Sequence, residues 1–446
     1  MPCGFTQAAL RVVNRIVDVR PAEVSALAWS WLYIFSVLSA YYVLRPIRDQ
    51  MGVAGGVDNL PWLFTGTLAG MLLLNVPYGF LIRSFPRTIF IPIAYRFFSA
   101  NILIFALALH VASPDQAIWV GRVFFIWTSI FNLFVVSIFW ALIVDLFSSE
   151  QGKRLFGFIA AGATLGSIAG SAVTATTARH LAAGYLLVGA ALLLEVAVFC
   201  VRRLSRLSGA LSKHPRGDDG DRAIGGSGLA GFRDALASPY LLNVSLFLLF
   251  FAVTSTFLYF QQATIVSRTF HDRASQTAFF ATIDLAVNLL TFVAQIVLTG
   301  PLLRRLGVGA TLAILPAFSI VSFAAVAAWP AVASVVVAQV LRRSGNFAIA
   351  RPTREILFTV VSREDRYKTK SFIDTVVYRL GDQVGAWSFA SLGYFGLGLT
   401  AVSAVASLAS VLWLLNSLWL GKKEEELGRA TAERLSPPAA GGTAER

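Results

Sequence analysis

The feature that most constrains this chain is a succession of long runs of apolar residues. The hydrocarbon layer of a membrane is about 30 Å thick, so a helix needs about 20 mainly apolar residues to cross it. Runs of this length recur along the whole 446-residue sequence. They predict twelve membrane helices at 24–44, 60–82, 88–110, 117–144, 155–177, 184–201, 240–262, 276–299, 308–328, 330–350, 371–394 and 399–420.

The runs are continuous rather than alternating, which predicts helices and argues against a membrane β-barrel. Hydrophobic residues make up 56% of the chain and charged residues 14%, against about 45–50% and about 25% in soluble domains. The expected fold class is therefore an all-α integral membrane protein. A soluble enzyme, a disordered chain and a disulfide scaffold are excluded.

No motif for catalysis, cofactor binding or metal binding is present. Cys3 and Cys200 are too few for a multi-thiolate metal site. The four histidines are scattered and lack metal-ligand spacing. There is no Walker motif. We therefore expect no enzyme, no cofactor and no metal.

Lys and Arg in the loops predict the orientation. With a cytoplasmic N-terminus, 27 of the 37 Lys and Arg fall on the cytoplasmic side and five on the outer side. We therefore expect both termini in the cytoplasm. The +13 net charge follows from this topology, so no nucleic-acid partner is expected.

A long polar, Gly-rich loop divides the spans into six plus six. Gly162, Gly166 and Gly170 in the first half, and Gly381 and Gly385 in the second, are spaced by four, which lets helices approach closely. These echoes indicate an internal duplication, as in major facilitator transporters. The expected organisation is a cytoplasmic N-terminus (1–23), a six-helix bundle (24–201), a linker (202–238), a second six-helix bundle (239–420) and a cytoplasmic tail (421–446).

Ionisable residues inside a bilayer are costly, so they usually face a partner or a water-filled cavity. Span one ends with Arg45, Arg48 and Asp49. A guanidinium is a planar fork that matches phosphate or carboxylate oxygens, which makes both arginines candidate substrate contacts. An interfacial Arg45–Asp49 ion pair is the alternative interpretation.

Spans three and four carry Arg96 and Arg122, which we expect either to pair with Asp145, Glu195 or Asp284 or to face a cavity. Asp145 lies at the cytoplasmic edge, where a gate ion pair and a substrate contact are equally plausible. Burial in an apolar helix suits a carboxylate to proton coupling, so Glu195 and Asp284 are candidate proton sites.

The densest charged stretch in the apolar part of the chain comprises Arg354, Glu355, Asp374, Arg379 and Asp382. Arg379 and Asp382 share a helix face at i,i+3. A purely topological role would not need charges inside a span, so this cluster favours a function.

Three motifs resemble the nucleotide transporter family, the ATP:ADP antiporters of plastids and intracellular bacteria, over about residues 25–420. Leu44-Arg45-Pro-Ile-Arg48-Asp49 is similar to the family's Leu-Arg-x-x-Lys-Asp. Phe139-Trp140 through Asp145, followed by Lys153-Arg154-Leu-Phe-Gly, is similar to its Phe-Trp, acidic and Ala-Lys-Arg-Phe elements. Arg351-Pro-Thr-Arg354-Glu355, followed by Lys368, Lys370, Ile373-Asp374 and Arg379-Leu-Gly, is similar to its Pro-Thr-Lys-Glu, Lys-x-Lys, Ile-Asp and Arg-Leu-Gly elements.

The resemblance implies a twelve-helix major facilitator fold in a bacterial inner membrane. It implies that charged residues in spans one, four, seven and ten take part in nucleotide exchange. Three of these positions fall on Arg48, Asp145 and Arg354, which keep the family's charge sign. The span-seven acid has no counterpart in 255–262.

We therefore predict a monomeric secondary-active carrier of an anionic, phosphorylated small molecule, with the lipid bilayer as its other partner. Arg45, Arg48, Arg122, Arg354 and Arg379 are the predicted substrate contacts. Asp49, Asp145, Glu355, Asp374 and Asp382 are the predicted gate or coupling residues. The alternatives are a proton-coupled carrier of another small metabolite or siderophore-like compound, and a non-transporting membrane scaffold.

Overall fold

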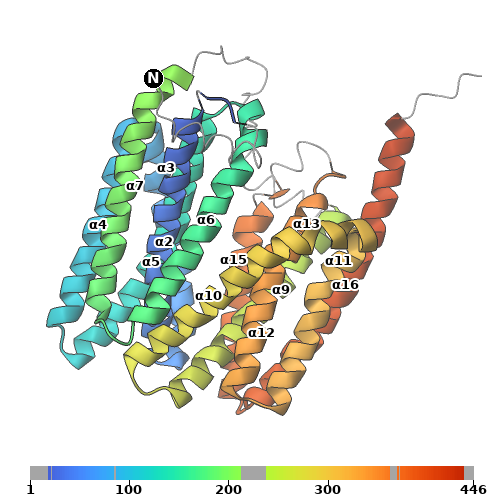
Figure 1. The fold of residues 1–446 in the computed structure, drawn as a ribbon. Coiled ribbons are helices and arrows are strands. Elements are labelled where there is room, and N and C mark those ends of the chain that lie inside the picture. Colours follow the sequence, from blue (N-terminus) through green and yellow to red (C-terminus); the bar gives the residue numbers. More distant parts are fainter. Residues whose placement is uncertain are drawn as a thin grey trace, which may run out of the picture. The chain divides into compact units, whose positions relative to one another are not determined.

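A computed structural model describes residues 19–21, 23–84, 87–211, 238–361, 369–370 and 372–435. These residues form helices and short connections, with no β-strand among them (Figure 1). Most of the predicted N-terminal segment and linker, Lys368 and the end of the predicted tail lie outside the described residues.

The N-terminal part of the chain folds into long helices. They are α2 (Val24–Ala54), α3 (Leu60–Ser84), α4 (Arg87–Val111), α5 (Pro114–Leu146), α6 (Ser149–Thr177) and α7 (Ala183–Leu211), with a short 3₁₀ turn, η1 (Val57–Asn59), before α3. Capping boxes begin α5 and α6, because the Ser113 and Ser148 side chains accept from the backbone N–H three residues on. Helix α7 continues to Leu211, beyond the predicted end of span six.

The C-terminal part is also helical. Its elements are α9 (Pro239–Thr269), α10 (Arg273–Val297), α11 (Thr299–Ala328), α12 (Val332–Gly345), η2 (Asn346–Ala350), α13 (Arg351–Ile356), η3 (Ile373–Val377), α15 (Tyr378–Tyr394) and α16 (Leu399–Leu435). Gly307 has a φ of 72° inside α11, a left-handed conformation that favours glycine. It separates a short first segment of α11 from the membrane-length remainder.

Within the described residues, ten helices are long and apolar enough to cross a membrane. The other two predicted spans are helical but interrupted. Helix α12, the π-helical turn η2 and α13 follow one another without a break, and a second π turn, η3, leads directly into α15. Neither composite helix contains an uninterrupted α-helix of 18 residues, so the twelve-helix layout remains a prediction.

The chain packs into two compact units. The first comprises the described part of Met1–Gly220 together with Ala263–Leu289; the second comprises the described parts of Asp221–Gln262 and Leu290–Arg446. The end of α9 and most of α10 thus pack with the N-terminal helices. The expected division of the chain at the linker stays a prediction.

Helix α2 packs against α5, α6 and α7 in the first unit (Figure 1). Glycines on α6 allow its close approach to α2: a Cβ on Gly166 would lie 2.4 Å from the Phe35 carbonyl oxygen, and one on Gly170 would lie 2.4 Å from that of Ser39. Ser39 Oγ donates to the Gly166 carbonyl at 3.0 Å. The close approach expected from this glycine spacing is confirmed.

The second unit contains the corresponding contact. A Cβ on Gly381 would lie 2.5 Å from Ala252 Cβ of α9, and one on Gly385 would lie 2.9 Å from Thr256 Cβ. Small residues spaced by four therefore join α6 to α2 in one unit and α15 to α9 in the other.

Candidate functional site

Arg45 and Asp284 form an ion pair inside the first unit. Arg45 Nη1 lies 3.5 Å from Asp284 Oδ1, and the side chains are 18% and 2% exposed. Asp284 comes from the middle of α10, far along the chain from α2. Pro46 follows Arg45 within α2 and has no N–H, so the carbonyl of Tyr42 loses its helical partner at this point.

Arg48 lies one turn further along α2 and bonds to its neighbour Asp49. Its Nε and Nη2 donate to Asp49 Oδ1 at 2.9 and 2.6 Å, and its Nη1 lies 3.3 Å from Ser129 Oγ. The guanidinium carbon is 4.8 Å from the centre of the Phe125 ring. In this structure Arg45 pairs with Asp284 and Asp49 pairs with Arg48, and the alternative Arg45–Asp49 interpretation stays a prediction.

Arg122 lies at the same end of the first unit. Its Nη2 donates to the Gly55 carbonyl at 3.2 Å, and its guanidinium lies over the Trp119 ring at 4.5 Å. Among the described residues, no carboxylate lies within ion-pair distance of Arg122. Of the two expectations for Arg122, a carboxylate partner or a cavity, the described residues therefore supply no carboxylate partner.

Among the described residues, all five members of the predicted cluster in the second unit take part in ion pairs. Arg354 Nη2 donates to Asp374 Oδ1 at 2.9 Å, and Arg379 Nη1 donates to Asp382 Oδ2 at 3.1 Å. Lys370 pairs with Glu355. Asp382 is also within hydrogen-bond reach of Thr256 on α9, at 3.5 Å.

Both elements that carry the Arg354–Asp374 pair are linked to π turns. Asp374 lies within η3, and Arg354 follows η2 directly through α13. A π turn inserts an extra residue into the helical repeat and rotates the side chains beyond it, and such turns are frequent at functional sites. The sequence pattern gave no sign of either turn.

Three of the predicted substrate contacts keep an unused donor. The Nε–H groups of Arg45, Arg122 and Arg354 are buried and have no acceptor among the described residues. A buried donor without an acceptor costs free energy. Each guanidinium therefore has hydrogen-bonding capacity for a further oxygen atom.

The remaining predicted residues lie elsewhere. Asp145 is exposed near the end of α5. Glu195 pairs with Arg96 at 3.4 Å on an exposed face of α4 and α7, as one of the sequence predictions allowed. The structure thus groups Arg45 with Asp284, and Arg48 with Asp49, but not with Asp145 or Glu195.

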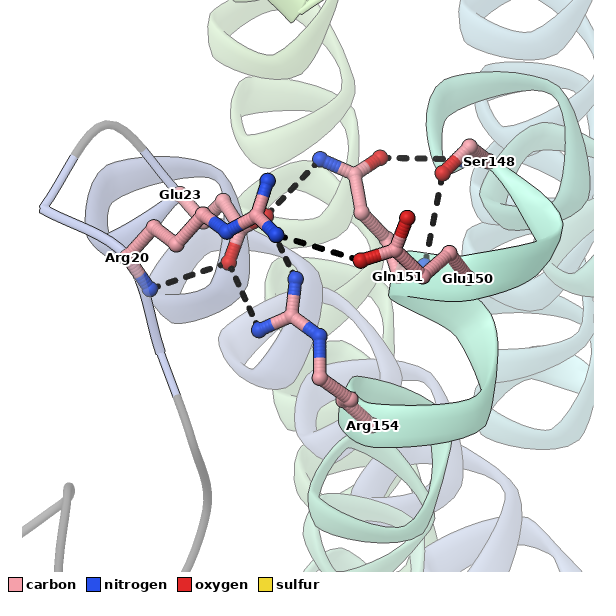
Figure 2. A network of polar contacts seen from close by, with 6 residues as sticks. All are labelled: Arg20, Glu23, Ser148, Glu150, Gln151 and Arg154. Atoms are coloured by element: carbon pink, nitrogen blue, oxygen red, sulfur yellow. Dashed lines mark hydrogen bonds and ion pairs between the residues drawn. The ribbon is translucent and has the colours of Figure 1, made fainter.

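A polar network at the start of α2 was not foreseen. Glu23 accepts from Gln151 at 2.9 Å and from Arg154 at 3.0 Å, while Arg20 pairs with Glu150 (Figure 2). Glu23 precedes the membrane span. Burial alone raises the pKa of its carboxyl, but hydrogen bonds from the Arg20 N–H, Gln151 and Arg154 outweigh burial and bring the pKa below its ordinary value of 4.5. The network joins the start of α2 to the start of α6.

Arg342 in α12 was also missed, although an arginine in the middle of a span is itself a signal. Its side chain is 1% exposed. Its guanidinium bonds only to neutral oxygens among the described residues: Ser319 Oγ, Ser255 Oγ, Thr254 Oγ1 and the Phe251 carbonyl. It also lies over the Phe251 and Trp413 rings, at 5.3 and 5.8 Å.

Comparison with known proteins gives distant relatives. No protein-family model matches the chain. The ADP,ATP carrier protein 2 of Chlamydia pneumoniae is 21% identical, covering 91% of this chain and 88% of that protein. The ADP,ATP carrier protein 1 of Chlamydia muridarum is 26% identical over 47% of this chain and 46% of its own length.

Among solved structures, a bacterial homologue of the iron transporter ferroportin, in an inward-facing state, is similar. Its TM-score is 0.60 at 15% identity, covering 89% of this chain and 98% of that one. The chain is thus distantly similar in sequence to the chlamydial ADP,ATP carrier proteins and similar in fold to a solved membrane transporter.

Proposed function

We propose that this protein is a secondary-active carrier that moves an anionic, phosphorylated small molecule across a bacterial inner membrane, with both termini in the cytoplasm. The layout would be twelve helices in two six-helix halves, which alternate between inward-open and outward-open states. Nucleotides are the first substrates to test, because the relatives are ADP,ATP carriers.

The observation that carries the proposal is how the predicted arginines are held. Arg45, Arg48, Arg354 and Arg379 each pair with one aspartate, and Arg45 and Arg354 each keep a buried Nε–H without an acceptor among the described residues. Phosphate oxygens match the guanidinium fork. A phosphate that competes with the aspartate for the guanidinium can therefore also satisfy the unused donor once it is bound.

This arrangement suits exchange. Without substrate, each guanidinium is neutralised by its aspartate, and a lone charge in the bilayer interior is costly. A bound anion replaces the aspartate as counter-charge, which frees the aspartate to change partner. An unloaded carrier is then held by its own ion pairs, while a loaded one changes state.

The test is uptake of labelled ATP by the purified protein in liposomes, with and without ADP inside. We expect uptake that depends on internal ADP and is lost in Arg45→Gln and Arg354→Gln. Arg203→Gln, at an exposed position near the end of α7, is the matched control and should transport normally. Absence of nucleotide transport by correctly folded protein would refute the nucleotide substrate.

A second candidate is a proton-coupled carrier, and the position of Asp284 favours it. This carboxylate is 1% exposed in the middle of α10 and holds Arg45. Its protonation would remove the counter-charge and release the guanidinium, much as a bound anion would. Transport that collapses with an uncoupler and ignores internal nucleotide would support this candidate over exchange.

A further inference from the structure

An ion pair lies on an exposed face of the first unit, between the apolar helices α4 and α7. Arg96 Nη2 is 3.4 Å from Glu195 Oε2, and the two side chains are 50% and 43% exposed. Arg96 is the tenth residue of the 25-residue helix α4, about 14 Å from its start at 1.5 Å per residue. Glu195 is at the middle of the membrane-crossing part of α7, Ala183–Leu207.

The surroundings of this pair are apolar and exposed. Ile93, Phe97 and Ile104 on α4 are 61, 61 and 63% exposed, and Leu192 on α7 is 63% exposed. We call this surface the α4–α7 face: Ile93, Arg96, Phe97, Ile104, Leu192 and Glu195. A guanidinium carries five N–H donors, yet that of Arg96 has a single hydrogen bond among the described residues.

Lipid is a poor cover for such a face. Acyl chains offer no acceptor, and an arginine reaches the headgroups only from near a helix end. Exposed Asn101 differs, because its amide donates to the Phe97 carbonyl of its own helix at 2.6 Å. The exposed charges of Arg96 and Glu195 therefore indicate that another protein surface, rather than lipid, covers this face.

In place of the monomer expected from the sequence, we propose that two copies of this chain dimerise through the α4–α7 face. A two-fold axis places the same surface on both sides, so a face that carries one acid and one base complements itself. Each Arg96 then lies between its own Glu195 and Glu195 of the second copy, and four alternating charges are shielded from lipid by the flanking apolar side chains.

Cysteine cross-linking in native membranes tests the contact. The test uses single-cysteine variants Leu192→Cys and Phe97→Cys, in full-length protein with Cys3→Ser and Cys200→Ala. The matched control is Leu408→Cys, which is 64% exposed on α16. With a short thiol cross-linker we expect dimer yields about tenfold above the control, which corresponds to about 1.4 kcal/mol of preference.

Charge reversal tests the pairing between copies. Arg96→Glu leaves two acids on the face and Glu195→Arg leaves two bases, so each variant alone should lose dimer about tenfold. Co-expressed under different tags, the two variants should pair with each other at wild-type yield. A purely intramolecular ion pair predicts no such mixed pair.

Two results would overturn the proposal. One is cross-linking at Leu192 and Phe97 no higher than at Leu408, which would leave the face to annular lipid and the protein a monomer. The other is Arg96→Glu dimers as abundant as the wild type. The cysteine variants keep both charges, so they remain informative even where a charge variant fails to fold.

Discussion

Two arginines within apolar helical segments, one in each unit, are satisfied in opposite ways. Arg45 in the first unit faces the carboxylate of Asp284 and keeps one donor without an acceptor among the described residues. Arg342 in the second unit has four hydrogen bonds to neutral oxygens and aromatic rings on its faces. The first is held by one charge, the second by many fixed dipoles.

The difference indicates different roles. A guanidinium held by a single carboxylate can exchange that partner for another anion, so Arg45 suits a moving part. Releasing Arg342 would break its hydrogen bonds to α9 and α11 at once. Arg342 therefore fixes the packing of α12 against these helices, and its removal should unfold the second unit rather than alter transport selectivity.

The largest effect is expected for Arg342→Ala. It leaves a cavity beside Trp413 and removes the donor from the hydroxyl oxygens of Ser319 and Ser255, so the variant should lose about 4 kcal/mol of stability. Thermal unfolding in detergent measures this loss. Arg342→Lys should recover only part of it, because one ammonium cannot reach four acceptors. Wild-type stability of Arg342→Ala would show that this cluster is not structural.

The next effect concerns the exchangeable pair. Arg45→Ala leaves Asp284 buried without its counter-charge and should cost about 3 kcal/mol. Adding Asp284→Asn should restore most of the stability while transport stays absent. A double variant as unstable as Arg45→Ala alone would mean that Arg45 stabilises the unit by packing, and the contrast with Arg342 would fail.

Smaller losses of stability are expected at the glycines that bring two helices close together in each unit. Gly166→Ala brings a Cβ within 2.4 Å of the Phe35 carbonyl oxygen, so helices α6 and α2 must separate at a cost of about 1–3 kcal/mol. Gly385→Ala should behave similarly against α9. Gly157→Ala is the matched control on α6, since its Cβ meets nothing within 4 Å, and it should be neutral or slightly stabilising.

The smallest effect is a pH dependence from Glu23. Its folded-state pKa is below the ordinary 4.5, so its contribution is complete above 4.5 and is lost as the pH falls through the lower folded-state pKa. Glu23→Gln should lower the free energy of unfolding by about 1 kcal/mol at neutral pH. In thermal unfolding, it should also weaken the loss of stability below pH 4.5. The Glu150 side chain is 72% exposed, so Glu150→Gln should leave the loss of stability at acid pH unchanged.

Much of the architecture follows from the sequence. The length of the apolar runs fixed the helical membrane class, because only a helix satisfies its backbone within such a run. The glycines spaced by four correctly predicted the close approaches of α6 to α2 and α15 to α9. Arginines and aspartates inside the spans were singled out as charges that need partners. Two expectations, Arg96 with Glu195 and Arg379 with Asp382 on one helix face, are compatible with the structure.

Which charge meets which was decided only by tertiary structure. Arg45 and Asp284 are more than two hundred residues apart in the sequence. The pattern of residues along one helix does not show which other helix packs against it. The π turns η2 and η3, which set the direction of Asp374 and Arg354, cannot be recognised from the periodicity of apolar residues in the sequence. The neutral oxygens that bind Arg342 come from two helices, α9 and α11. These hydroxyls and carbonyls can bind one guanidinium only because the tertiary structure brings the two helices together.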